Sequence, residues 1–187
     1  MKRLILGSAS PRRKQLLSSM GLSFEVKAIN CDESHPSHLE GEDIARHIAL
    51  KKAEAASFLL TNDEILITAD TVVWKNGRHL AKAQDEHEAL EMLNFLSGGC
   101  HEVITACALK TLNNTVIISA VTEVQFAVLS PEDISHYIRH FQPFDKAGAY
   151  GIQEWIGLIG IERINGCYNN VVGLPTQKLY ATLKTML

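Results

Sequence analysis

Residues 7–13 of the chain are Gly7-Ser8-Ala9-Ser10-Pro11-Arg12-Arg13. They follow the short apolar run 4–6 and precede a segment with helical spacing, so they predict a strand, a tight loop and a helix start. Pro11 suits the first helical position, and the serines before it can cap the free amides of the first turn. A helix N-terminus followed by two arginines suits a phosphate group. The segment therefore predicts a phosphate or nucleotide site; the alternative is a capped helix with two solvated arginines.

The composition predicts a single globular domain over residues 1–187. The chain is 46% hydrophobic and its net charge is −3, so it lacks the basic excess of a protein that wraps DNA or RNA. No apolar run is long enough for a membrane span or a signal peptide. The four cysteines form no CxxC pair. We therefore expect a cytoplasmic protein with reduced thiols and with no membrane or stable nucleic-acid partner.

Strand-like and helix-like segments alternate along the chain and predict an α/β fold. The expected helices span residues 11–20, 42–60, 85–96, 131–141 and 175–187. The expected strands span residues 2–6, 23–27, 65–74, 78–81, 101–112 and 115–128. The last two strands form a long hairpin, so the sheet is not purely parallel. We expect an elongated, twisted mixed β-sheet flanked by helices, with two lobes and a cleft between them. The glycine-rich segment 145–168 predicts only short strand-like pieces.

Asp70 lies in the middle of an apolar strand, residues 65–73, where an unpaired carboxylate would be costly. It should therefore face a cation, a metal or a cleft, as a general base or a metal ligand. The alternative is a structural aspartate that caps a neighbouring loop. Cations that suit phosphate stand at Lys51, Lys52, Lys82 and Lys146, although any single lysine is more often a solvated surface residue.

Among metals, a hard divalent cation fits the candidate ligands better than zinc. Residues 31–38 mix cysteine, histidine and carboxylates, but no second half with zinc-ligand spacing follows. Mg²⁺ binds few carboxylates plus phosphate oxygens, and Glu33, Asp70 and a nucleotide would supply such a set. The sequence lacks the P-loop, dinucleotide and nucleophile-elbow motifs, so it predicts none of those enzyme classes.

Five motifs then occur in the order found in a known family. They cover residues 8–13, 69–73, 101–105, 145–153 and 166–175. Together they resemble the Maf family of nucleoside triphosphate pyrophosphatases, nearly end to end, and are most similar to the branch that acts on dTTP and UTP. The resemblance implies hydrolysis to the nucleoside monophosphate and pyrophosphate with a divalent cation, Mg²⁺ or Mn²⁺. It also implies a fold similar to that of inosine triphosphate pyrophosphatases, and a homodimer.

The resemblance further implies a role for each matching residue. Asp70 matches the proton acceptor that activates water. Base preference is implied for three positions: Arg12, Thr71 and Gln153. The polar pocket around the phosphates and the metal is implied for Ser8, Arg13, Glu33, Lys52 and Lys82. A glutamine amide can pair with the donor–acceptor edge of a pyrimidine, which agrees with the implied substrates.

Two other functions stay open on the sequence. One is a pyrophosphatase of the same family for 7-methyl-GTP or for non-canonical purine nucleotides. The other is a non-catalytic, nucleotide-binding regulator of cell division. Asp70 favours an enzyme over a regulator, because a pure binder would gain nothing from a carboxylate beside an anion.

Overall fold

The computed structural model describes residues 2–56 and 60–187. In this part of the chain one seven-stranded sheet has the order β2-β1-β3-β5-β6-β7, with β4 paired to β3. The strands are β1 (Arg3–Leu6), β2 (Phe24–Val26), β3 (Glu64–Lys75), β4 (Arg78–Leu80), β5 (Cys100–Lys110), β6 (Thr115–Phe126) and β7 (Ile161–Asn165). β1 pairs in parallel with β2 and β3, and the other pairs are antiparallel. The predicted mixed sheet is confirmed.

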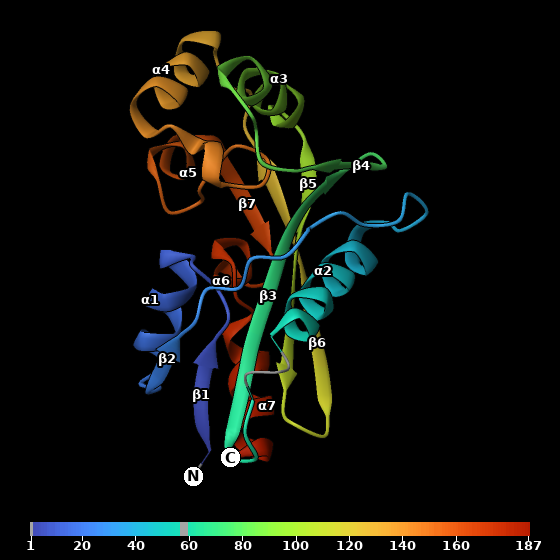
Figure 1. Cartoon of the computed structure of the whole chain (residues 1–187). Coiled ribbons are helices and arrows are strands. Elements are labelled where there is room, and N and C mark those ends of the chain that lie inside the picture. The colour runs from blue at the N-terminus through green and yellow to red at the C-terminus, as the bar shows by residue number, and fades with distance from the viewer. Residues whose placement is uncertain (1, 57–59) are drawn as a thin grey trace.

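Helices gather in two groups around the long strands (Figure 1). The helices are α1 (Pro11–Ser19), α2 (Gly41–Ala55), α3 (Glu86–Leu96), α4 (Pro131–Phe141), α5 (Trp155–Gly160), α6 (Tyr168–Val172) and α7 (Thr176–Met186), with a 3₁₀ turn, η2, at Pro143–Asp145. In Figure 1, α3, α4 and α5 lie at one end of β3, β5 and β6, α1, α2 and α7 lie nearer the opposite end, and α6 lies between the two groups. Among the described residues no helix is both long and apolar enough to cross a bilayer.

Each group of helices has its own hydrophobic core. Phe126 and Tyr137 belong to the core beneath α3 and α4. At the opposite end, Ile67 and Ala69 of β3 pack with α1 and α7 on one face of the sheet. Val72 packs with α2 on the other face, because successive strand residues point to opposite sides. The predicted two lobes therefore correspond to separate cores joined by three long strands.

One edge of β3 lacks a ladder partner over residues 68–72 within the described chain. β1 pairs with residues 64–67 of this edge and β4 pairs with residues 73–75. The opposite edge is paired with β5 without a break from residue 66 to residue 74. The chain leaving β1 borders this gap, since Gly7 donates its backbone N–H to the carbonyl of Ile67 at 2.8 Å. At this unpaired edge, neighbouring residues of β3 that point to opposite faces of the sheet can border one cavity.

The structure corrects two predicted elements. The sequence predicts a helix over 42–60, but α2 ends at Ala55 and residues 57–59 lie outside the described residues. Ala56 and Leu60 are buried against Ile5, so the apolar spacing continues for reasons of packing after the helix has ended. The glycine-rich segment 145–168 holds β7 as predicted but also the helix α5, which its glycines conceal from propensity arguments.

Candidate active site

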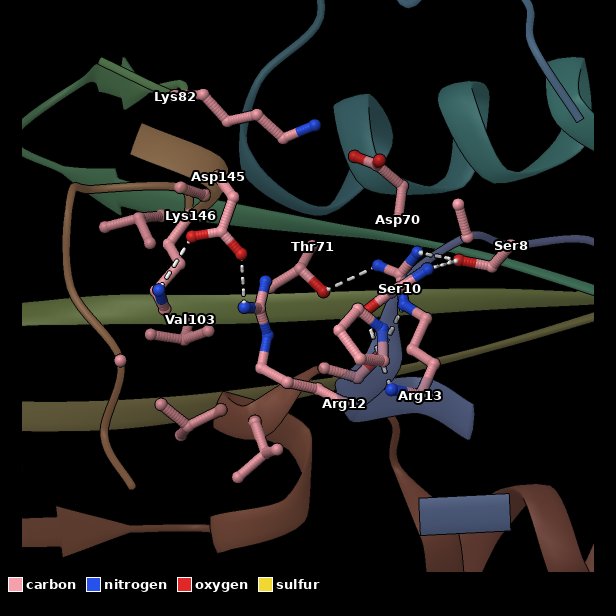
Figure 2. Close-up of a pocket in the computed structure, with 18 of the residues that line it drawn as sticks. Ser8, Ser10, Arg12, Arg13, Asp70, Thr71, Lys82, Val103, Asp145 and Lys146 are labelled. Atoms are coloured by element: carbon pink, nitrogen blue, oxygen red, sulfur yellow. Dashed lines mark hydrogen bonds and ion pairs between the residues drawn. The ribbon is translucent and has the colours of Figure 1, made fainter. Parts of the chain in front are cut away.

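A cavity of about 400 Å³ opens at the gap in β3 (Figure 2). It is lined by every residue to which the resemblance assigns a role: Ser8, Arg12, Arg13, Glu33, Lys52, Asp70, Thr71, Lys82 and Gln153. These residues come from six separate parts of the chain, and the fold brings all of them to one place. Of the other candidate cations, Lys146 also lines it, whereas Lys51 does not and pairs with Asp32. Apolar side chains also line the cavity, among them Ile29, Val73, Val103, Val171 and Val172.

The loop after β1 and the first turn of α1 form one wall of the cavity. Ser10 is the N-cap, and its hydroxyl accepts the backbone N–H of Arg13 at 3.5 Å. Ser8 accepts the backbone N–H of Ser10 at 3.2 Å, which fixes the loop before the cap. Pro11 stands at the start of the helix as predicted. Residues 7–13 all line the cavity, so the positive end of the α1 dipole borders it.

Arg13 is bound mainly by protein groups, whereas the sequence predicts that it binds a phosphate group. Within the described residues its guanidinium donates to the carbonyls of Ala69 at 2.8 Å and Gly173 at 3.0 Å, and to the hydroxyls of Ser8 at 3.4 Å and Thr71 at 3.1 Å. Arginine has five N–H donors, so these bonds leave one for a ligand. Burial lowers the Arg13 pKa from its ordinary value. Arg13 therefore holds the walls of the cavity together and presents a single donor.

A chain of hydroxyl groups fixes the direction in which Thr71 donates. Thr105 donates its only hydroxyl proton to the backbone carbonyl of Asn170 at 2.8 Å. Thr71 lies 3.0 Å from the Thr105 hydroxyl, so Thr71 must be the donor between the two. The Thr71 oxygen in turn accepts from Arg13. Thr71 can therefore meet a ligand in the cavity only as an acceptor.

Lys52 of α2 joins two carboxylates on the opposite side of the cavity. Its ammonium group donates to Asp70 Oδ1 at 2.8 Å and lies 3.0 Å from Glu33 Oε1. Lys52 and Asp70 are both buried, so Asp70 faces a cation and a cavity, as its place in an apolar strand predicts. Burial opposes ionisation of Glu33, but the hydrogen bond from Lys52 and the charges of Lys52 and Lys82 outweigh it and lower the Glu33 pKa. Figure 2 shows the Lys82 side chain pointing toward Asp70.

The same carboxylates are the candidate ligands for a divalent cation. Glu33 and Asp70 converge on one point, marked by the Lys52 nitrogen. No group of three or more histidine, cysteine, aspartate or glutamate side chains in the described residues is placed to hold a metal, the 31–38 segment included. Two carboxylates fit Mg²⁺, which takes its remaining ligands from phosphate and water. The donor set therefore suits a cation that binds together with a phosphate ligand.

A second polar network at the other end of the cavity contains residues that sequence reasoning missed. Arg12 donates to Asp145 Oδ2 at 2.7 Å, and Lys146 donates to Asp145 Oδ1 at 2.7 Å (Figure 2). Lys146 also pairs with Glu154 at 3.0 Å. Burial opposes ionisation of Asp145, but hydrogen bonds from Lys146 and Arg12 outweigh it and lower the Asp145 pKa. The available signal was an acidic residue next to Lys146 in the 145–153 motif.

The chain is similar to known proteins along nearly its whole length. A family model described as Maf-like protein matches residues 3–186. A Phocaeicola vulgatus protein named dTTP/UTP pyrophosphatase is 50% identical over 185 residues, which are 98% of this chain and 96% of that protein. A Bacteroides fragilis protein of the same name is 48% identical over 185 residues, with the same two coverages. The structure of the Staphylococcus aureus Ham1 protein matches with a TM-score of 0.53 at 14% identity, covering 100% of both chains, which shows a shared fold.

Proposed function

Because this chain belongs to the Maf family, we propose that it hydrolyses dTTP and UTP to the nucleoside monophosphate and pyrophosphate. The observation that carries the proposal is the place of Asp70. Its carboxylate is buried in the unpaired part of β3, 2.8 Å from the Lys52 ammonium, and lines a cavity with cations on several sides. This arrangement provides a base beside groups that bind an anion. The names of the relatives that are about half identical to this chain agree with it.

In the proposed reaction a water oxygen bonds to the α-phosphorus while the bond from that phosphorus to the bridging oxygen breaks. Asp70 accepts the proton of the water, and the pyrophosphate leaves with the bond's electron pair. Lys52 and Lys82 stabilise the negative charge that develops on the leaving group, since both line the cavity near Asp70. A divalent cation held by Glu33, Asp70 and the phosphates would add Lewis-acid stabilisation of the same charge.

The selection of uracil and thymine is proposed to depend on Arg12 and Gln153. Arginine can only donate hydrogen bonds, so Arg12 favours the keto oxygen of these bases and disfavours the amino group of cytosine. Gln153 offers one donor side and one acceptor side to the same base edge. The apolar side chains of Val103, Val171 and Val172 line the cavity and suit the faces of a flat base.

The experiment that tests the function is pyrophosphate release from a panel of nucleoside triphosphates. The panel is run with Mg²⁺, with Mn²⁺ and with EDTA, and Asp70→Asn serves as the inactive control. We expect metal-dependent release from dTTP and UTP, and a fall of about 10²–10⁴-fold in the variant, the usual contribution of a general base. Full activity of Asp70→Asn would refute the role of that residue.

The same panel separates the alternatives. Release only from 7-methyl-GTP or non-canonical purine nucleotides would keep the chemistry and reject the base preference. Binding of nucleotide with no release of pyrophosphate would favour a nucleotide-binding regulator.

We further propose that residues 1–187 form one domain and that the enzyme is cytoplasmic and homodimeric. Light scattering of the purified protein tests the last point.

A further inference from the structure

Gln153 is carried by a tight turn at the edge of the cavity. Glu154 donates its backbone N–H to the carbonyl of Gly151 at 3.0 Å, so residues 151–154 form a hydrogen-bonded turn with Gln153 in its third position. Just before the turn, Gly148 and Ala149 have left-handed backbone, with φ of 69° and 56°. Ala149 is fully buried, and a non-glycine residue in this conformation must be held there by its surroundings.

Tyr137 of α4 holds both ends of this turn. Its hydroxyl oxygen accepts the backbone N–H of Gly151 at 3.0 Å, and its proton is donated to the Glu154 carboxylate. Tyr137 is fully buried, and burial together with the bond to Glu154 raises its pKa well above the ordinary value. The hydroxyl therefore stays protonated and remains a donor throughout the neutral range.

Gly151 allows Glu154 to fold back against the turn. A Cβ atom at this position would lie 2.8 Å from the carboxyl carbon of Glu154, closer than real contacts allow. The second Glu154 oxygen binds Lys146 at 3.0 Å, and Lys146 binds the same Asp145 that holds Arg12. One buried hydroxyl is thus connected to both residues proposed to contact the base.

The place of the 151–154 turn decides where the donor and the acceptor of the Gln153 amide meet the base. A glutamine amide rotated by half a turn exchanges its donor and its acceptor. Uracil presents a keto acceptor where cytosine presents an amino donor, so a freely rotating Gln153 would accept either base. A turn held in one place presents the Gln153 amide at a fixed point of the base edge, which adds to the preference of Arg12 for UTP and dTTP over CTP.

We propose that Tyr137 is a positioning residue for pyrimidine selection, acting through the 151–154 turn on Gln153. This inference rests on the proposed function, because it assumes that Gln153 contacts the base. Tyr137 itself does not line the cavity, so its effect on substrates is transmitted by the hydrogen bonds to Gly151 and Glu154.

The test compares kcat/KM for UTP with kcat/KM for CTP in Tyr137→Phe. The ratio of the two constants is independent of the folded fraction, since both substrates meet the same folded enzyme. We expect the UTP preference to fall about tenfold, a coupling typical of hydrogen-bonded neighbours. Tyr180→Phe is the matched control, because Tyr180 is exposed on α7 and does not line the cavity. Gly151→Ala displaces Glu154 by another route and should lower the same ratio.

Gln153→Ala and the double variant Tyr137→Phe/Gln153→Ala complete the design. If Tyr137 acts through Gln153, both should show the same reduced preference. An unchanged ratio in Tyr137→Phe, with a reduced ratio in Gln153→Ala, overturns the inference and leaves the proposed function intact. An unchanged ratio in Gln153→Ala overturns the inference together with the role of Gln153. Absence of release from UTP by the wild-type protein overturns the proposed function itself.

Discussion

Replacement of Lys52 by methionine removes the ammonium group that Asp70 and Glu33 share, at almost constant side-chain length. The Lys52 and Asp70 side chains are 10% and 11% exposed, and removal of one partner from a buried pair costs about 3–5 kcal/mol. The Glu33 side chain is 47% exposed, so loss of its ion pair with Lys52 costs less than about 1 kcal/mol. We expect a loss of about 3 kcal/mol in the free energy of unfolding without a divalent cation. For a chain of this size, that loss lowers Tm by about 6–12 °C.

The same variant should respond more strongly to a divalent cation. Without the ammonium group, two carboxylates converge on a point that carries no positive charge, so a bound cation relieves their repulsion. A ligand that binds only the folded state raises Tm, and at a given concentration the rise is larger for a tighter ligand. We therefore expect MnCl₂ to raise the Tm of Lys52→Met by more than it raises that of the wild-type protein. Scanning fluorimetry in EDTA and in MnCl₂ measures both effects.

Lys51→Met provides the control on the same helix. Lys51 pairs with Asp32, whose side chain is 69% exposed, so its loss should cost less than about 1 kcal/mol. Its response to MnCl₂ should match that of the wild-type protein. Two results would refute the reasoning: Lys52→Met as stable as wild type in EDTA, or equal MnCl₂ shifts in the two lysine variants.

Two further predictions concern buried groups near the cavity. Burial, with a smaller effect of Lys75, lowers the His101 pKa to about 3, so the unfolded chain takes up a proton between pH 6.5 and 3 that the folded chain does not. The contribution of His101 to the free energy of unfolding is therefore fully present above pH 6.5 and is lost as the pH falls, by about 2 kcal/mol at pH 5. Urea titrations at pH 7.5 and pH 5 should show a smaller loss of stability in His101→Gln than in the wild-type protein. An equal loss in the two proteins would contradict the assignment. Thr105→Val removes the acceptor of the Thr71 proton and one of two donors to the Asn170 carbonyl, which still accepts the backbone N–H of Gly173. We expect a loss of about 1 kcal/mol in the free energy of unfolding, measured from the urea midpoint, and an unchanged midpoint would exclude the hydroxyl chain.

Part of the candidate site could be predicted from local signals, and its remaining residues followed from the resemblance to a known family. Ser10 and Pro11 mark a helix N-terminus by residue type alone, and a carboxylate within an apolar strand indicates a cavity without further information. The mixed sheet followed from the long hairpin of 101–128. These predictions needed only short windows of sequence and the cost of burying a charge.

Other features depend on contacts between distant residues and were not predictable. Arg13 meets Ala69 and Gly173, which are 56 and 160 positions away, so its role as a link between walls is visible only in the structure. Tyr137 resembles any buried aromatic residue in the sequence, and its bond to Gly151 gives it a further role. The end of α2 was misplaced because Ala56 is buried by packing rather than by helix formation.

The separation of the two lobes has an evolutionary consequence. Asp70 and Lys52 lie on β3 and α2, whereas Gln153 lies in a segment attached to α4 in the other core. The proposed general base Asp70 and one of the residues proposed to select the base, Gln153, are therefore carried by different parts of the fold, whereas Arg12 lies on α1. We therefore expect substitutions in the 142–154 segment to change the proposed contact of Gln153 with the base while leaving the Asp70 carboxylate in place. Chimeras that exchange this segment between relatives should change substrate while keeping the reaction.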